Sequence, residues 1–166
     1  MFKHQGKNRT YKHNLRLAIL LSFIAGIVNV TGVLAVQTLT TNVTGHFAFF
    51  AEEVTKHNYQ EAVAFLIYTL FFLAGAFTSN FLAELVAIKK KKLSHIPAIT
   101  IELVILIALG LFGFYSNFSI LGVKWIACSL LFAMGIQNAL VTTISKSTVR
   151  TTHLTGLFTD LGIELS

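Results

Sequence analysis

The sequence predicts an all-α fold: a polytopic bundle of transmembrane helices with an inverted-topology repeat whose second copy is truncated. Three observations predict it. Of the 166 residues, 54% are hydrophobic and 12% are charged, about half the charged share of an average soluble domain. The apolar residues gather in long uncharged runs, and two short patterns occur twice in the same order. This much apolar surface exceeds what a water-soluble protein can cover, so we expect it to contact lipid.

The first sixteen residues form a basic segment that we expect to lie in the cytoplasm. An uncharged stretch follows at 17–36, which supplies the roughly 20 apolar residues that a helix needs to cross a bilayer. It is longer than the apolar part of a signal peptide, and no A-x-A-like cleavage site follows it. We therefore predict that 17–36 is an uncleaved first span.

The next apolar segment, 44–54, is too short to cross. If it did cross, the lysines at 89–92 would lie outside, against the positive-inside rule. We predict a half-helix here that is either re-entrant or lies on the membrane surface. Thr44 and Gly45 open it, since a threonine hydroxyl at an N-cap accepts a hydrogen bond from a free backbone N–H.

Three further apolar stretches are long enough to span, at 62–83, 97–118 and 125–144. With the N-terminus in the cytoplasm, these spans place all three basic clusters on the cytoplasmic side, as the positive-inside rule requires. The clusters are residues 1–16, Lys89 to Lys92, and Lys146 with Arg150. The loops predicted to be external are poor in lysine and arginine.

The chain repeats itself. The pattern FIAGIVN at 23–29 matches FAMGIQN at 132–138, and TNVTGHF at 41–47 matches THLTGLF at 152–158. Three spans separate the copies and an odd number reverses direction, so the repeat is inverted, as in many secondary transporters. We assign the first repeat to 17–118 and the second to 121–166. Counterparts of the second and third spans are missing, so we expect a fragment of a protein with about six spans.

At these motifs the sequence resembles the YoaK-like family of uncharacterised multi-pass bacterial membrane proteins, a domain-of-unknown-function family. The resemblance covers residue 17 onward and rests on Gly26 with Asn29, Thr44-Gly45, Gly135 to Ala139, and 149–162. The chain departs from the family pattern at Asn29, where an acid is commoner, and at His46, where asparagine is usual. The resemblance implies a protein of the bacterial plasma membrane and brings no established substrate.

Amide side chains recur on corresponding faces of the first and fourth spans. We take Asn29, Gln137 and Asn138 as candidate substrate-binding residues that line a central polar site. The alternative is helix packing, in which an asparagine adds an interhelical hydrogen bond of about 0.6–2 kcal/mol and small residues allow close approach. The small residues on these faces are Ser22, Gly26, Gly32 and Gly135.

The Thr44-Gly45 and Thr155-Gly156 pairs would begin two half-helices. A helix N-terminus attracts anions because its N–H groups are free and the helix dipole is positive there. If both ends point inward, they would bind the anionic group of a substrate, with Arg150 as a fixed cation; ordinary capping is the alternative. Asp160 is a candidate coupling residue. We expect Glu84 and Glu102, near the cytoplasmic ends of their spans, to pair with nearby lysines, with proton coupling as the alternative.

These features favour a small secondary transporter of an unidentified solute. The alternative is a membrane scaffold, sensor or assembly subunit, which the lack of a midplane charge pair favours. We expect no enzyme, cofactor or metal site, because no nucleophile elbow, P-loop, Rossmann or HExxH pattern occurs. Basic residues in short clusters beside spans indicate no nucleic-acid partner. The expected partners are the lipid bilayer and a small or anionic solute, and homo-oligomer formation is open.

Overall fold

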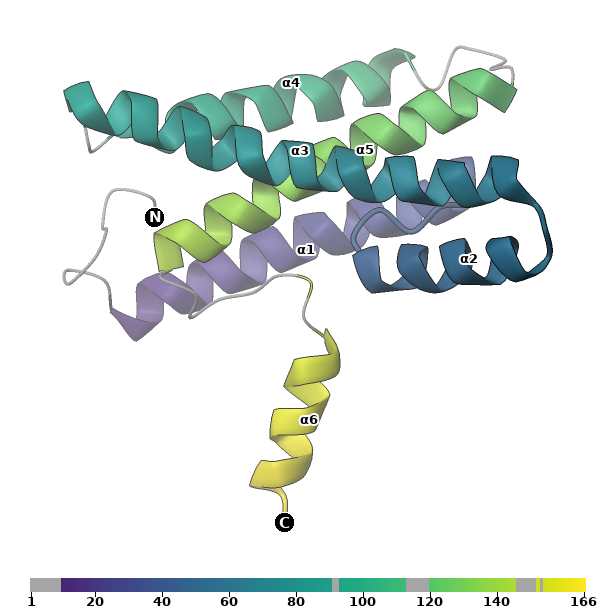
Figure 1. Cartoon of the computed structure of the whole chain (residues 1–166). Helices are drawn as coiled ribbons and strands as arrows, with labels where there is room; N and C mark the ends of the chain where they lie inside the picture. The colour runs from purple at the N-terminus through teal and green to yellow at the C-terminus, as the bar shows by residue number, and fades with distance from the viewer. Residues whose placement is uncertain (1–9, 91–92, 113–119, 146–151, 153) are drawn as a thin grey trace.

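The computed structural model describes residues 10–90, 93–112, 120–145, 152 and 154–166. Over these ranges the chain forms α-helices and no strand, so the predicted all-α class is confirmed (Figure 1). The helices are α1 (Tyr11–Val36), α2 (Val43–Thr55), α3 (Tyr59–Lys90), α4 (Ile96–Phe112), α5 (Ile120–Ser145) and α6 (Leu154–Glu164).

Three of these helices, α1, α3 and α5, are long and apolar enough to cross a membrane. They coincide with three of the four predicted spans. The fourth, α4, has 17 described residues and is about 25 Å long at 1.5 Å per residue, slightly less than the hydrocarbon thickness of about 30 Å. The predicted span at 97–118 reached further, and its residues 113–118 lie outside the described ranges.

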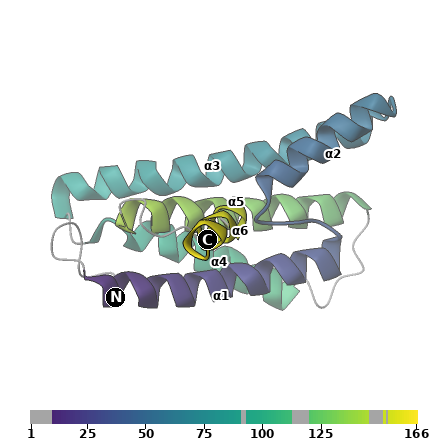
Figure 2. The ribbon, with the colours of Figure 1, turned by 90° about the horizontal axis from the view of Figure 1, so that it is seen from below.

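The centre of the bundle is α5. It packs against α3, α4 and α1, and it runs antiparallel to α1 (Figures 1 and 2). Its most apolar stretch is 61% buried, against 28% for α1 and for α3. Two apolar clusters follow one another along it. The first surrounds Ala127 to Met134, and the second surrounds Ile136 to Ile144.

The tightest contact is the crossing of α3 and α5. A Cβ atom on Gly75 would collide with the backbone carbonyl of Phe132, and one on Gly135 would collide with that of Phe72. In each helix a glycine follows a phenylalanine by three residues, and the two pairs interlock. Absence of a side chain at both glycines is therefore what allows the two backbones to touch.

Gly26 behaves differently from its repeat counterpart Gly135. The sequence predicts that both lie at helix contacts, but a Cβ atom on Gly26 would meet nothing within 4 Å, and the residue is exposed on α1. Within the described chain the packing prediction for Gly26 is therefore wrong. The physical reason is that α3 crosses α5 at Gly135, whereas no described helix crosses α1 at Gly26.

The ends of the bundle differ in charge. α1 and α4 begin, and α3 and α5 end, at the same end of the bundle (Figure 1), so the helix ends that adjoin the predicted cytoplasmic clusters lie together. At the opposite end, Lys124 Nζ of α5 is 2.8 Å from Glu61 Oε1 of α3. The predicted topology places both of these residues on the external side.

The last helix, α6, projects away from the bundle (Figures 1 and 2). Its large apolar side chains are exposed, among them Phe158, Leu161 and Ile163. α2 is similar in length but packs along α3. The two short helices thus have different surroundings.

Candidate functional site

The chain between α1 and α2 folds back into the bundle. After Val36 the loop 37–42 returns alongside α1, and α2 then runs toward the end that α1 has reached (Figure 1). Gln37 has a left-handed conformation with φ 52°, and the Thr38 N–H donates to the Gly32 carbonyl at 3.3 Å. This fold-back is the geometry that the re-entrant interpretation predicts. We call residues 37–46 the re-entrant segment.

Gly32 allows the loop to lie on the surface of α1. A Cβ atom there would be 2.9 Å from the carbonyl oxygen of Thr38 and would collide with the methyl group of Thr40. Both distances are too short for a carbon atom. Gly32 was predicted as a helix-packing residue, and the structure shows that it packs against a loop.

Asn29 anchors the turn of this hairpin. Its Oδ1 atom accepts hydrogen bonds from the N–H groups of Thr40 at 2.9 Å and Thr41 at 3.3 Å. Asn29 lies seven residues before the end of α1 at Val36, about 10 Å inside the bundle. Irregular backbone at membrane depth is tolerated only where protein or a water-filled cavity satisfies its polar groups. Asn29 supplies that satisfaction from the side chain of a neighbouring helix.

The N-cap of α2 is Asn42. Its Oδ1 atom accepts from the Gly45 N–H at 2.9 Å, and a Cβ atom on Gly45 would lie 2.9 Å from the Asn42 side chain. The prediction that Thr44 caps this helix is wrong, because Thr44 is its second residue and is exposed. Asparagine caps at least as well as threonine, so the earlier residue takes the position.

His46 is buried between α2 and α3, with 1% of its surface exposed. Its ring centroid lies 5.6 Å from that of Tyr68 and 5.9 Å from that of Phe65. Its Nε2 atom is 2.6 Å from the Leu39 carbonyl oxygen. Because a carbonyl only accepts, Nε2 carries the proton, and in the neutral ring Nδ1 is an acceptor.

Polar groups from α1, the loop, α2 and α3 thus meet in one place. We call this the buried polar cluster, and it comprises Asn29, Thr38, Thr40, His46 and Tyr68. The Thr38 hydroxyl donates to the Val36 carbonyl at 3.0 Å. The cluster lies at the first apolar core, to which Tyr68 belongs.

Two atoms of the cluster have no hydrogen-bond partner among the described residues: Thr40 Oγ1 and His46 Nδ1. Leaving a buried polar atom unsatisfied costs about 1–3 kcal/mol, and native proteins seldom do so without a functional reason. A hydroxyl and an imidazole nitrogen can between them donate to and accept from a small polar molecule. The cluster is therefore the best candidate binding site in the described chain.

The amides of the second repeat have separate partners. Asn138 Oδ1 lies 3.4 Å from the Thr152 hydroxyl, which matches in sequence the contact of Asn29 with Thr41. Gln137 is buried, and its Nε2 atom donates to the Leu21 carbonyl of α1 at 2.9 Å, while its Oε1 atom has no partner among described residues. No hydrogen bond joins Asn29, Gln137 and Asn138 to one another.

The other predicted site residues are dispersed. Thr155 and Asp160 are exposed on α6, Gly156 is half-buried there, and Ser22 is half-buried on α1. Arg150 lies outside the described residues. Glu84 accepts a hydrogen bond from Asn80 at 2.9 Å; its predicted lysine partners, 89–92, have no described side chains.

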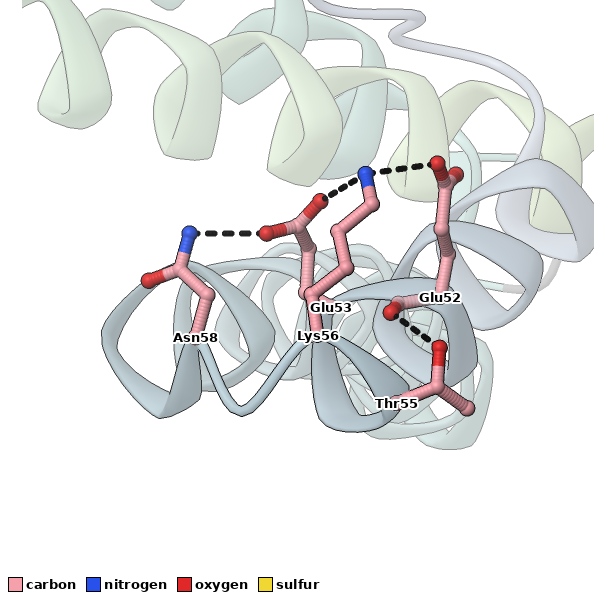
Figure 3. Close-up of polar contacts among 5 residues, drawn as sticks. All are labelled: Glu52, Glu53, Thr55, Lys56 and Asn58. Atoms are coloured by element: carbon pink, nitrogen blue, oxygen red, sulfur yellow. Dashed lines mark hydrogen bonds and ion pairs between the residues drawn. The ribbon is translucent and has the colours of Figure 1, made fainter.

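The turn between α2 and α3 carries an exposed charge cluster (Figure 3). Lys56 Nζ lies 2.7 Å from Glu52 Oε1 and 3.0 Å from Glu53 Oε1, and Asn58 Nδ2 donates to Glu53 Oε2 at 2.7 Å. Hydrogen bonds from Lys56 and then Asn58 lower the pKa of Glu53, and those to Glu52 and Glu53 raise the pKa of Lys56. These ion pairs and hydrogen bonds are local contacts at the turn that joins α2 to α3.

Sequence reasoning missed Thr40, His46 and Tyr68 as site residues. Their signal was available in the polar run QTLTTN at 37–42. This run lies between a full span and a helix too short to cross, so it had to lie inside the protein if the hairpin was re-entrant. The burial of His46 depends on contact with α3, so the residues around position 46 could not predict it.

The chain belongs to the family described as protein of unknown function (DUF1275), whose profile matches residues 17–166. This confirms the resemblance drawn from the repeated motifs, and together with the apolar helices it indicates a membrane protein. Neither the curated proteins nor the solved structures contain a match.

Proposed function

We propose that this member of the family is a small secondary transporter that binds its solute at the buried polar cluster. The single observation that carries the proposal is the re-entrant segment, whose turn is held about 10 Å inside the bundle by Asn29. Broken or half-helices that begin within the bundle are the usual way in which transporters place polar groups near the bilayer midplane.

The arrangement of the two repeats supports this proposal. α1 and α5 carry the same glycine-and-asparagine pattern and run in opposite directions (Figure 1). Asn29 Oδ1 accepts from the backbone N–H of Thr41, and Asn138 Oδ1 accepts from the hydroxyl of Thr152; each threonine lies in the segment that leads to the next short helix. An inverted repeat predicts that corresponding residues meet in this way from opposite sides.

The proposed solute is small and carries an anionic or strongly hydrogen-bonding group. The N-terminus of α2 favours negative charge through the helix dipole, and Thr40 and His46 offer a donor and an acceptor. Asn29 has a different role, since its Oδ1 atom is occupied by two backbone N–H groups. It positions the segment that binds the solute.

Thr40→Val tests the site with little risk to the fold. The Thr40 hydroxyl has no partner, so replacing it with an isosteric methyl group should leave the free energy of unfolding unchanged or raise it. Solute uptake should nevertheless fall at least tenfold. The assay is uptake into proteoliposomes of an equimolar mixture of carboxylates, phosphate, amino acids and sugars, quantified by mass spectrometry.

Thr78→Val is the matched control. Thr78 is exposed on α3, and its hydroxyl donates to Ala74 of its own helix at 2.7 Å, so uptake should remain at the wild-type level. If the wild-type protein takes up no solute, the transporter proposal is refuted. If Thr40→Val takes up as much solute as the wild type, the proposed binding site is refuted.

The second candidate is an assembly subunit, which the exposed apolar face of α6 favours. Phe158 and Ile163 are 64% and 68% exposed there. In that case the wild-type protein takes up no solute, and Phe158→Ser should release a membrane protein that co-purifies with it. Retention of uptake and of every co-purifying protein in Phe158→Ser would argue against this alternative.

A further inference from the structure

We propose that Glu102 of α4 is a proton-binding site inside the membrane and that its carboxyl group is neutral in the arrangement described here. In the transporter proposed above, Glu102 would be the group whose protonation is coupled to the conformational change. This coupling role rests on the proposed function, whereas proton binding by Glu102 does not.

Glu102 faces the interior of the bundle. It is the only charged residue among the 17 of α4, and 8% of its surface is exposed. Ala98, one turn before it, is fully buried, and Ile105, one turn after it, packs against the first apolar cluster. Glu102 lies six residues from the start of α4, about 9 Å along the helix axis.

Its position along the bundle lies between the two apolar clusters. Ala98 belongs to the second cluster, with Ile136 and Leu140 of α5, whereas Ile105 contacts the first. On α5 the boundary between the clusters falls at Gly135 and Ile136. Glu102 therefore lies near the level of Gln137, a residue with 1% of its surface exposed whose buried Oε1 atom has no described partner.

Among the described residues, no cation forms an ion pair with Glu102, and no hydrogen bond of its carboxyl group is found there. Lys124 of α5 is held by Glu61 at the opposite end of the bundle, and Lys12 and Arg16 of α1 are exposed. The lysines 89–92 have no described side chains.

Other titratable groups lie on the elements around α4, and no ion pair among the described residues joins any of them to Glu102. They are Cys128 on α5, Tyr59, Glu61, Tyr68 and Glu84 on α3, Tyr11 and His13 on α1, and His95 just before α4. An unpaired carboxylate in apolar surroundings is far more costly than the neutral acid, so such a group takes up a proton. A buried ionisable residue within a span is accordingly a functional site by default.

Infrared spectroscopy tests the protonation state directly. The full chain is placed in lipid nanodiscs at neutral pH, and the spectrum of Glu102→Gln is subtracted from that of the wild type. We expect a carboxylic-acid C=O band that Glu102→Gln removes and that Glu84→Gln retains, since the Glu84 side chain is exposed and accepts a hydrogen bond from Asn80. A wild-type spectrum without this band, or one in which Glu102→Gln keeps it, overturns the proposal.

Fluorescence tests the coupling. Trp125 is the only tryptophan, and its ring on α5 lies edge-on to Phe71 of α3 at 6.1 Å. Its emission should change with pH in the wild type, stay constant in Glu102→Gln, and change with a shifted midpoint in Glu102→Asp. A Glu102→Gln titration identical to that of wild type would refute the coupling.

The two proposals fail separately. If the infrared band is present and no metabolite in the mixture is taken up, proton binding stands and the transporter is rejected. If metabolite uptake occurs and the band is absent, the transporter stands and Glu102 is rejected as a proton site.

Discussion

The two short helices share a sequence pattern and differ in almost everything else. In both α2 and α6 a Thr-Gly pair occupies the second and third helical positions, and a phenylalanine follows two residues later. α2 lies along α3 and buries His46, whereas α6 projects from the bundle with Phe158, Leu161 and Ile163 exposed (Figure 1). The Thr-Gly pattern therefore accompanies a short helix in both places, and a neighbouring long helix decides what that helix buries.

α2 packs along α3, and α3 is held by its crossing with α5. The substitution with the largest expected effect disrupts that crossing. Gly135→Ala places a Cβ atom against the backbone carbonyl of Phe72, and backbone cannot rotate away as a side chain can. We expect the free energy of unfolding to fall by about 3 kcal/mol, the upper end for overpacking. Unfolding by denaturant in detergent micelles measures it.

Gly26→Ala is the control. Gly26 occupies the equivalent position of the first repeat, and a Cβ atom placed on it would have nothing within 4 Å. Here alanine should be neutral or stabilising by up to about 1 kcal/mol, from helix propensity alone. Equal destabilisation by both substitutions would show that α1 has a neighbour at Gly26.

The next largest effect is a difference in stability loss between substitutions of the two asparagines that precede the short helices. Asn29→Leu leaves two N–H groups of the loop without an acceptor and should cost about 2 kcal/mol. Asn138→Leu removes one long contact of 3.4 Å and should cost less than about 1 kcal/mol. Hydrogen exchange at Thr40 and Thr41 reports the first effect locally. Asn29→Asp should keep exchange slow, because a carboxylate also accepts both bonds.

A smaller effect is expected when one phenylalanine of each short helix is replaced by alanine and the losses of stability are compared. The Phe49 ring of α2 lies 5.3 Å from the Phe65 ring of α3, and Phe49→Ala should destabilise the chain by about 1 kcal/mol, as aromatic pairs do. Phe158→Ala in α6 removes a ring that is 64% exposed and should have almost no effect on thermal unfolding. A larger loss for Phe158→Ala would reveal a neighbour that α6 packs against.

The smallest effect concerns the charge cluster at the end of α2. Because the pKa of Glu53 is lowered, its stabilisation is fully present above the ordinary carboxyl pKa and is lost as pH falls through the lowered value. The pKa of Lys56 is raised, so its stabilisation is lost only as pH rises through that value. Titration of the Glu53 carboxyl by NMR should show its pKa moving upward in Lys56→Met. An unchanged pKa would contradict the ion pair.

Much of the fold was readable from the sequence because it depends on local composition. The apolar runs at 17–36, 62–83 and 125–144 predicted α1, α3 and α5, and the short run at 44–54 predicted α2. Long runs without charge have one stable solution in a bilayer, a helix that satisfies its own backbone. Boundaries were less accurate: α1 begins at Tyr11 rather than at residue 17, since basic residues continue a helix beyond the lipid.

The candidate site was readable only in part. Asn29 stood out as an amide within a span, and Thr44-Gly45 marked the half-helix. Thr40, His46 and Tyr68 did not stand out, because their burial requires the loop to fold back and α3 to cover it. The cap moved from Thr44 to Asn42 for a similar reason: both residues can cap a helix, and the path of the loop decided between them.

Residues adjacent along the chain are enough to predict which segments are helical and which helix ends carry positive charge. What those helices meet depends on contacts between segments far apart in the sequence. The pattern F-x-x-G occurs at 23–26, 72–75 and 132–135; the second and third interlock backbone to backbone, and the first has open space beside its glycine. A glycine permits close approach, but a partner helix must come from elsewhere in the fold.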